Sequence, residues 1–398
     1  MNCENYKTKN HVIRIIFYII IFFPLLGENI MSTAFGENIS KAFSIISCCY
    51  IFVITITRKK VIISSFTILT FLLAGLRIMI LFLSPSSIVI NGANNMITPY
   101  GLLAYSMLFL LIDQQMKNKV ELHAIFKSLM IIMTISVFLN LFFDGNLNLA
   151  NNMTVFKEAI STGYTNSRKW LFGHRNMIFI HHLMWIVFSF ITYKLERRNY
   201  TKLYLFQITF TMFIGIVSWN STMMFTTFIV FILSLLKDKF LQNISIIHYV
   251  ITYLILEIGI VFLRIQDLFS FIIVGILHRN LSFTGRTGIW NYYIDQFFNN
   301  SILNKLFGNY GVTKLLVNSH NMFLGLLSFT GIVGVSLYMF LIFSSAHQLN
   351  KSKSCNSKFI SIIIFGFLIN ALTMEFYLQP LIALYIGFKI NQINILLE

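Results

Sequence analysis

Charge is scarce in this chain of 398 residues: only 11% are Asp, Glu, Lys or Arg, while 57% are hydrophobic. Soluble domains carry about a quarter charged residues. One large soluble core does not explain the deficit, because apolar runs of about 15 to 24 residues recur along the whole chain, the length that crosses a bilayer. The composition therefore excludes a soluble enzyme or a secreted domain and indicates a polytopic integral membrane protein.

Cysteine and acidic residues are also few. The four cysteines show no paired spacing, and adjacent Cys48 and Cys49 lie in an apolar run, where we expect buried free thiols. The chain has only 14 acidic residues and 30 basic residues, which gives a formal charge of +16. We attribute this excess to membrane topology, since cytoplasmic loops collect Lys and Arg, and expect no nucleic-acid partner.

An all-α fold with about twelve transmembrane helices follows from the apolar runs. Only helices or closed barrels satisfy the backbone in lipid, and the runs lack the alternation of a barrel. The first run has no small-residue cleavage site after it, so it is an expected uncleaved span. We treat residues 1–398 as one integral membrane domain. The expected spans are roughly 12–27, 39–57, 61–83, 96–113, 124–143, 175–193, 203–217, 222–236, 245–263, 321–344, 359–373 and 378–392.

Basic residues set the expected orientation. If the N-terminus is inside, the cytoplasmic segments hold the greater part of the Lys and Arg residues, for example at 58–60 and 194–202, and also Lys389. The first outer loop instead holds Glu28 and Glu37. The positive-inside rule then predicts that both termini are cytoplasmic.

Two expected outer loops are long, at about 144–174 and 264–320, and loops of such length are usually functional or disordered. Within the second loop, the segment 281–290 opens an expected interfacial helix, which Ser282 or Thr284 can cap. Spacings of 4, 3 and 4 put its Arg and aromatic residues on one helical face. Such a face suits a headgroup boundary, and simple membrane anchoring is the alternative interpretation. These residues are Arg286, Trp290, Tyr293 and Phe297.

Positive charge in the second loop runs against the insertion bias, and anion binding is a natural reason for it. Arg forks match phosphate oxygens in a bidentate way, and Gly285 beside Arg286 permits close backbone approach. His320, at the mouth of the next span, is either a general base or a capping residue. The further basic residues are Arg264, His278, Arg279, Lys305 and Lys314, against Asp267 and Asp295.

Four motifs in this region resemble the signature of the O-antigen polymerase and O-antigen ligase family, which includes the Wzy-type polymerases of capsule and exopolysaccharide assembly. They are Thr284-Gly-Arg-Thr-Gly-Ile-Trp290, Leu306-Phe-Gly-x-x-Gly311, Ser319-His-Asn-Met-Phe-Leu324 and Gly331-x-x-Gly334. Their order, their spacing and their place in a large outer loop ahead of a late span all match.

The resemblance implies an inverting glycosyltransferase of GT-C-like architecture in the bacterial cytoplasmic membrane. Its donor would be a glycan on undecaprenyl diphosphate, and its acceptor another lipid-linked repeat unit or a lipid A core. No metal or other cofactor is implied, because Arg and Lys neutralise the leaving diphosphate. A flippase and a chain-length regulator are further implied partners.

Individual roles follow from the same resemblance. Arg286 would bind the diphosphate, and His320 would activate the acceptor or hold the sugar. Arg279, Trp290 and Asn321 would contact substrate.

The first long loop holds a second candidate group, in which Arg175 would contact phosphate and Trp170 sugar; a basic and aromatic membrane anchor is the alternative. The following His181 and His182 are adjacent, so they project to different helix faces, and we expect no zinc site. The segment 218–222 is an expected outer turn. Relatives carry a Ser-Arg pair near this point, which this chain lacks.

Ionisable residues within the expected spans are functional candidates. Arg77 and Glu375 lie near the outer boundary, where snorkelling explains them. Glu257 lies deeper and would pair with a basic group that the sequence does not identify.

A polymerase of polysaccharide repeat units is the leading hypothesis, and an O-antigen ligase, which shares the motifs, is the first alternative. A lipid-linked oligosaccharide flippase or other transporter is an alternative of another class. It predicts two related halves and broken midplane helices, and the sequence shows neither. A purely structural membrane protein would leave the basic loop unexplained.

Overall fold

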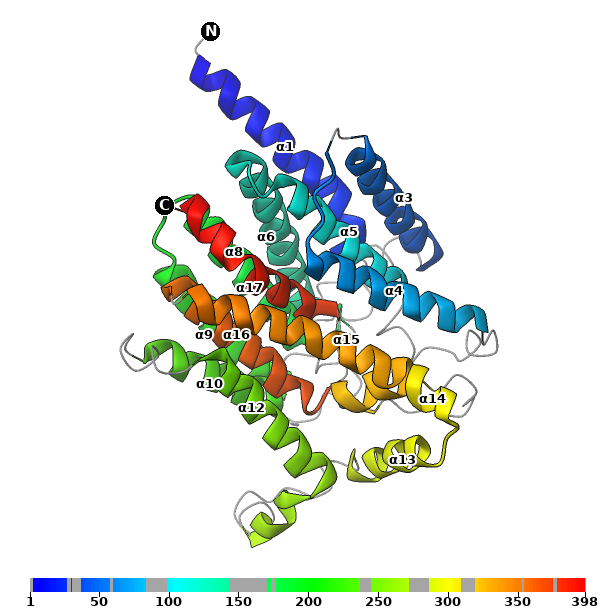
Figure 1. Ribbon diagram of the computed structural model, residues 1–398. Helices are drawn as coiled ribbons and strands as arrows, with labels where there is room; N and C mark the ends of the chain where they lie inside the picture. The colour runs from blue at the N-terminus through cyan, green and yellow to red at the C-terminus, as the bar shows by residue number, and fades with distance from the viewer. Residues whose placement is uncertain are drawn as a thin grey trace. The chain divides into compact units, whose positions relative to one another are not determined.

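The computed structural model describes residues 3–26, 30, 37–57, 60–83, 99–142, 170–172, 177–218, 220–236, 245–271, 286–308, 319–352, 354–374 and 378–397. Within these ranges the regular elements are helices, as expected (Figure 1). Each expected span overlaps one of them. The match confirms where the helices lie.

Four of the described helices are long and apolar enough to cross a membrane: residues 39–56 of α3 (Glu37–Ile56), α6 (Lys119–Phe142), α8 (Ile178–Leu195) and α15 (Met322–Ser352). Shorter apolar helices include most of α1 (Cys3–Leu26), α9 (Thr201–Val217), α10 (Ser221–Leu235) and α16 (Cys355–Ala371). The chain is therefore a helical membrane protein by length and composition. Twelve crossings and a GT-C-like architecture stay predictions.

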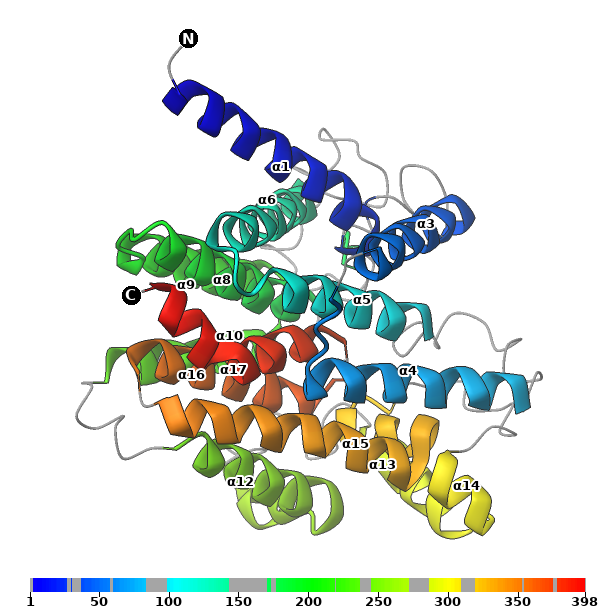
Figure 2. The same cartoon turned by 45° about the horizontal axis from the view of Figure 1, so that its top comes forward.

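The chain divides into two compact units. The first comprises Met1–Ile68, Leu103–Leu235 and Lys389–Glu398. In it α6 packs against both α1 and α8 (Figure 2). Cys48 on α3 is buried, whereas the neighbouring Cys49 is exposed, so the expectation of two buried thiols was wrong for Cys49.

Polar side chains join α1, α6 and the end of α8. Arg14 pairs with Glu121. Glu196 accepts hydrogen bonds from Lys127 Nζ at 2.9 Å and from His123 Nε2 at 3.0 Å. Burial by itself raises the pKa of the Glu196 carboxyl, but these two donors outweigh it and hold the pKa below its ordinary 4.5.

A buried ion pair lies in the same unit. Lys389 on α17 (Leu378–Leu397) places its Nζ 2.6 Å from Asp113 Oδ1 on α5 (Pro99–Gln115), and both side chains are almost inaccessible. Asp113 Oδ2 also accepts hydrogen bonds from Thr67 Oγ1 at 2.6 Å and from the Ser64 backbone N–H at 2.9 Å, at the start of α4 (Ser65–Leu83). Lys389 was expected on a cytoplasmic segment, which stays a prediction; the structure adds that Asp113 is its buried partner.

The second unit comprises Leu69–Leu102 and Leu236–Phe388. It contains α12 (Ile246–Glu257), the π-helical turn η4 (Ile258–Phe262), the 3-10 helix η5 (Ile265–Phe269), α13 (Arg286–Phe298), α14 (Ile302–Phe307), α15 and α16. The short helices α13 and α14 both pack on α15 (Figure 1). Stacking of Tyr249 on Phe365, with ring centroids 4.6 Å apart, joins α12 to α16.

The glycine motifs interlock where α14 meets α15. Gly331 breaks the helical path of α15 with φ 62° and ψ −166°, and Gly308 has φ 100°. A Cβ on Gly331 would collide with the backbone of Leu306, and one on Gly308 would lie 2.7 Å from the backbone of Phe329. Glycine is required at both positions, because each combines a left-handed φ with backbone-to-backbone contact.

Arg77 on α4 supports this break. Its guanidinium donates to Phe329 O at 3.1 Å and lies over the Phe329 ring, 5.3 Å from the centroid. Arg77 as a whole is only 7% exposed. Snorkelling was therefore the wrong explanation for Arg77: it binds a carbonyl beside the interrupted helix.

Candidate functional site

The predicted helix after Gly285 exists and begins at Arg286, which is half-buried. Its capping residues Ser282 and Thr284 lie outside the described residues. Trp290 and Tyr293 on α13 are 1% and 5% exposed and pack with Val261 and Leu324. This aromatic face binds the protein's own helices, so the membrane-anchor interpretation of Trp290 was wrong. Burying an indole here contributes a large apolar area.

A hydrogen bond joins α13 to the second motif. Trp290 Nε1 donates to Ser319 O at 2.9 Å, and both residues are buried. The sequence motif that contains Arg286 and the one that contains His320 therefore meet directly in the fold. A buried indole N–H needs such an acceptor, which explains why a Trp and a tight turn occur together.

The turn that follows presents His320. Its backbone is left-handed, with φ 51°, and the residue is half-buried. Its two neighbours in the chain are hydrogen-bonded to each other: Ser319 Oγ donates to Asn321 O at 2.7 Å. A non-glycine residue in this conformation costs energy, so the flanking contacts are what hold the imidazole in place.

Asn321 connects three segments. Its Oδ1 accepts from the Leu324 backbone N–H at 2.9 Å, which caps the start of α15. Its Nδ2 donates to Leu372 O at 3.1 Å, just beyond α16. Asn321 is completely buried. These bonds give it a scaffolding role beside His320, and its expected contact with substrate stays a prediction.

Glu257, at the end of α12, is only 2% exposed. Its carboxylate faces the side chains of Asn321 and Tyr253, yet neither oxygen makes a hydrogen bond of good geometry. In the described parts of the chain no basic side chain forms an ion pair with it, which does not support the expected basic partner. The α-helix changes to the π-helical turn η4 directly after Glu257, and such turns often mark functional sites.

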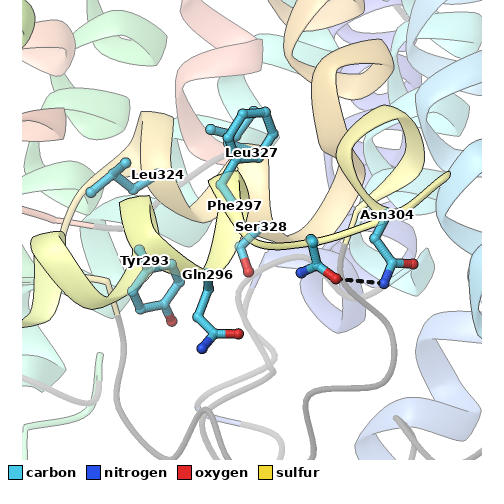
Figure 3. Close-up of a pocket in the computed structure, with 8 residues that line it drawn as sticks. Tyr293, Gln296, Phe297, Asn304, Leu324, Leu327 and Ser328 are labelled. Carbon is cyan, nitrogen blue, oxygen red and sulfur yellow. Dashed lines mark hydrogen bonds between the residues drawn. The ribbon is translucent and has the colours of Figure 1, made fainter. Parts of the chain in front are cut away.

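A shallow cleft adjoins this region (Figure 3). Asn304 Nδ2 donates to Asn300 Oδ1 at 2.8 Å across it. Charged and titratable residues in the sequence do not reveal this cleft, because none of the described residues that line it carries a charge. A signal was present in the four-residue spacing of Gln296, Asn300 and Asn304, but the turn between α13 and α14 means that no single helix carries all three. The lining residues are Tyr293, Gln296, Phe297 and Asn300, Asn304 of α14, and Leu324, Leu327 and Ser328 of α15.

The candidate site residues of the first long loop are not part of this site in the second unit. Trp170 lies in the first unit and is 2% exposed, so it is buried in protein and not an exposed anchor. Arg175 and Arg279 lie outside the described residues, as does Glu375. The expected turn at 218–222 does separate two helices, α9 and α10, and Asn220 Oδ1 caps α10 by accepting from the Met223 N–H at 3.0 Å.

The adjacent histidines of α8 have separate partners, as helix geometry predicts. His181 Nδ1 hydrogen-bonds Met177 O at 2.9 Å, and its ring stacks on Phe172. His182 Nδ1 instead hydrogen-bonds Thr211 Oγ1 on α9, also at 2.9 Å.

In the second unit the Trp290 hydrogen bond joins the segment of Arg286 to the segment of His320 and Asn321, and Glu257 on α12 faces Asn321. We call these residues, with Trp290 and Ser319, the motif cluster. The cluster offers an Arg at a helix start, an imidazole and a buried carboxylate. A search of protein-family models, curated proteins and solved structures found no match to this chain.

Proposed function

We propose that this protein is a glycosyltransferase that polymerises undecaprenyl-diphosphate-linked oligosaccharide repeat units at the outer face of the bacterial cytoplasmic membrane. The hydrogen bond from Trp290 to Ser319 carries the proposal, because it joins the motif of Arg286 to the motif of His320. The likeness of these motifs to the O-antigen polymerase and ligase family supplies the substrate class.

The reaction forms one bond and breaks one. The acceptor hydroxyl attacks the anomeric carbon, the bond from that carbon to the diphosphate oxygen breaks, and the configuration inverts. His320 takes the hydroxyl proton as general base. The electron pair leaves with the diphosphate, so negative charge develops there as the bond breaks.

Arg286 is suited to stabilise that charge. Its guanidinium presents a planar fork that matches two phosphate oxygens. Arg286 is also the first residue of α13, a helix of 13 residues. The positive end of the helix dipole favours an anion at this end. Fixed cationic groups of this kind stabilise a developing charge without reorganisation during the reaction, and we therefore propose that no metal is required.

A ligase that transfers finished glycan to a lipid A core would use the same chemistry with another acceptor. A flippase is favoured by one observation, the break in α15, since transporters often carry interrupted helices. Here, however, the backbone of α14 packs into the break and Arg77 binds the Phe329 carbonyl. The interruption is filled by protein atoms, which supports the enzyme.

The first test is the length of glycans on undecaprenyl diphosphate in a strain that lacks the gene. Accumulation of single repeat units is the expected result. Long polymer still attached to the carrier would assign ligase activity instead. Repeat units confined to the cytoplasmic leaflet would assign a flippase.

The second test complements that strain with Arg286→Lys, which keeps the charge but lacks the fork. We expect no restored polymer at normal protein level, and normal chain length would contradict diphosphate binding. Arg264→Lys is the control, because Arg264 bonds Asn291 Oδ1 at 2.6 Å within the same unit and has no proposed substrate contact. Equal loss in both variants would mean that only the packing of α13 was disturbed. Activity in membranes should also survive EDTA.

A further inference from the structure

Two histidines face each other in the first unit, and neither has a part in the proposed reaction. His11 on α1 places its Nε2 2.8 Å from Nδ1 of His123 on α6. Their rings stack with centroids 4.9 Å apart, and both residues are half-buried. Nε2 of His123 lies 3.0 Å from Glu196 Oε1, just beyond α8. A line of hydrogen bonds therefore joins three segments of the unit.

The hydrogen bond between the two rings limits how many protons the pair can hold. One of the two facing nitrogens must carry the hydrogen, and the other must offer its lone pair. A carboxylate only accepts, so Nε2 of His123 carries a hydrogen toward Glu196. With both rings neutral, His11 Nε2 donates to His123 Nδ1, and every condition is met.

Extra protons have no suitable place in this arrangement. The first would have to bind Nδ1 of His11, which in the described chain is buried without a hydrogen-bond partner. A hydrogen placed there would lose its hydration without compensation. The second would put hydrogens on both facing nitrogens, which could then not stay 2.8 Å apart. The docked pair therefore binds fewer protons than two histidines in water.

The charges nearest to His11 do not offset a further cation. Arg14 lies on the same helix, and Glu121 and Glu196 lie on the facing segments. Glu121 is already paired with Arg14, and it also accepts a hydrogen bond from Tyr18 Oη at 2.9 Å. Its charge is therefore already matched by a cation.

Glu196 is occupied as well. It contacts Lys127 Nζ at 2.9 Å and Arg198 Nε at 3.3 Å, besides its bond to His123. With Arg14 included, three cations and two carboxylates lie around the two histidines. This group is thus already positive before either ring is protonated.

The remaining neighbour of α1 is α3. Ser44 Oγ on α3 donates to Pro24 O at 2.7 Å, so this part of α3 lies beside the far end of α1. Lys41, one turn before Ser44, is therefore remote from His11. Lys60, which follows α3, is exposed and would only add positive charge.

Only the polar end of α1 depends on the histidine contact. Beyond it, Ile15 O accepts from Ser128 Oγ at 2.9 Å, and Tyr18 and Phe22 are buried. Apolar burial does not change with protonation. Loss of the contact would therefore release the residues before Ile15 and leave the remainder of α1 packed on α6.

We propose that His11 and His123 form a proton-sensitive latch: one bridging hydrogen holds the first turns of α1 on α6, and further protonation of the two rings releases them. The latch does not depend on the proposed function. Histidine in water gains its second ring proton near pH 6.5, so the latch should be closed above about pH 7 and open below about pH 6. The released pair binds at least one proton more than the docked pair. The ratio of released to docked ends should therefore rise at least about tenfold for each unit by which the pH falls.

The test uses the full-length protein in detergent, with its natural cysteines replaced and spin labels on Ile13→Cys and Val120→Cys. These positions are exposed on α1 and α6, so the labels do not disturb the packing. Dipolar broadening of the EPR spectrum reports how close the labels lie. We expect strong broadening at about pH 7.5 and its loss by about pH 5.5. Glu196 stays a carboxylate throughout, because its pKa lies below 4.5.

One variant removes the titration and keeps the bond. In His11→Gln the amide N–H can still donate to His123 Nδ1, but the side chain gains no proton. Its labels should stay close over the whole pH range. His347→Gln is the matched control, since His347 is an exposed histidine of α15 in the other unit. It should release the end of α1 as the wild type does.

Labels that stay equally close at every pH in the wild type would overturn the proposal. Equal loss of broadening in His11→Gln would do the same, because another group would then be the sensor. If His11→Gln does not dock at neutral pH, ¹⁵N NMR of the imidazole nitrogens in the wild type decides. His11 and His123 must gain protons in the pH interval in which the labels separate, and separation without that uptake would refute the latch.

Discussion

Replacing Lys389 with Met removes the cation that lies 2.6 Å from Asp113 and leaves a carboxylate whose side chain is 0% exposed. The Met side chain fills a similar volume, so the change tests charge and not cavity formation. The reasoning predicts a loss of stability in the first unit, because a buried carboxylate without its cation has lost both hydration and its counter-charge.

The magnitude follows from the surroundings of the pair. Breaking a buried ion pair by removing one partner costs about 3–5 kcal/mol. Asp113 keeps its hydrogen bonds from Thr67 Oγ1 and the Ser64 N–H, and these still stabilise the anion. We therefore expect a value near the lower limit, about 3 kcal/mol. Adding Asp113→Asn should recover most of the loss, because a neutral amide can still accept from Thr67 while carrying no buried charge.

The assay is equilibrium unfolding in detergent of the wild type, both single variants and the double variant, analysed as a double-mutant cycle. Arg198→Met is the control, since Arg198 contacts Glu196 at 3.3 Å but is 65% exposed, and exposed pairs contribute about 0–1 kcal/mol. The reasoning is refuted if Lys389→Met costs no more than this control. It is also refuted if the double variant is no more stable than Lys389→Met alone.

Three further outcomes follow from the structure, each measured by unfolding in detergent. Arg77→Met should cost about 2 kcal/mol, because it removes a charged donor from the Phe329 carbonyl beside the break in α15; no change would mean that water satisfies this carbonyl equally well. Gly331→Ala should unfold the second unit or lower its stability by several kcal/mol. Gly75→Ala is the control: Gly75 has an open position on α4, and the change should raise stability by about 1 kcal/mol. Equal effects of the two changes would contradict the close packing at Gly331. The pKa of Glu196 is lowered in the folded state, so its stabilisation is complete above about pH 4.5 and lost as the pH falls through the lowered value. Glu196→Gln should reduce this acid sensitivity, and an unchanged acid transition would argue against the contribution.

The helical architecture was predictable from sequence for a simple reason. Apolar runs of membrane length must be helical where lipid offers the backbone no hydrogen-bonding partner, and each expected span overlaps a described helix. The helix that starts at Arg286 was predictable from its periodicity. The motif residues were recognised by type and order, and glycines 308 and 331 proved to be those that the left-handed backbone requires.

Tertiary structure decided what these residues touch. Local patterns could not distinguish a Trp290 that anchors to lipid from one that donates to Ser319, because both need the same amphipathic spacing. Arg77 looked like a snorkelling residue, since its partner lies about 250 positions away at Phe329. The cleft lined by Gln296, Asn300 and Asn304 crosses the turn between α13 and α14, so no single helical period reveals it. The sequence by itself thus determined the membrane class and the helix positions, which depend on nearby residues and the solvent. Buried partners of charged and polar groups depend on which distant segments pack together, and only the folded chain specifies them.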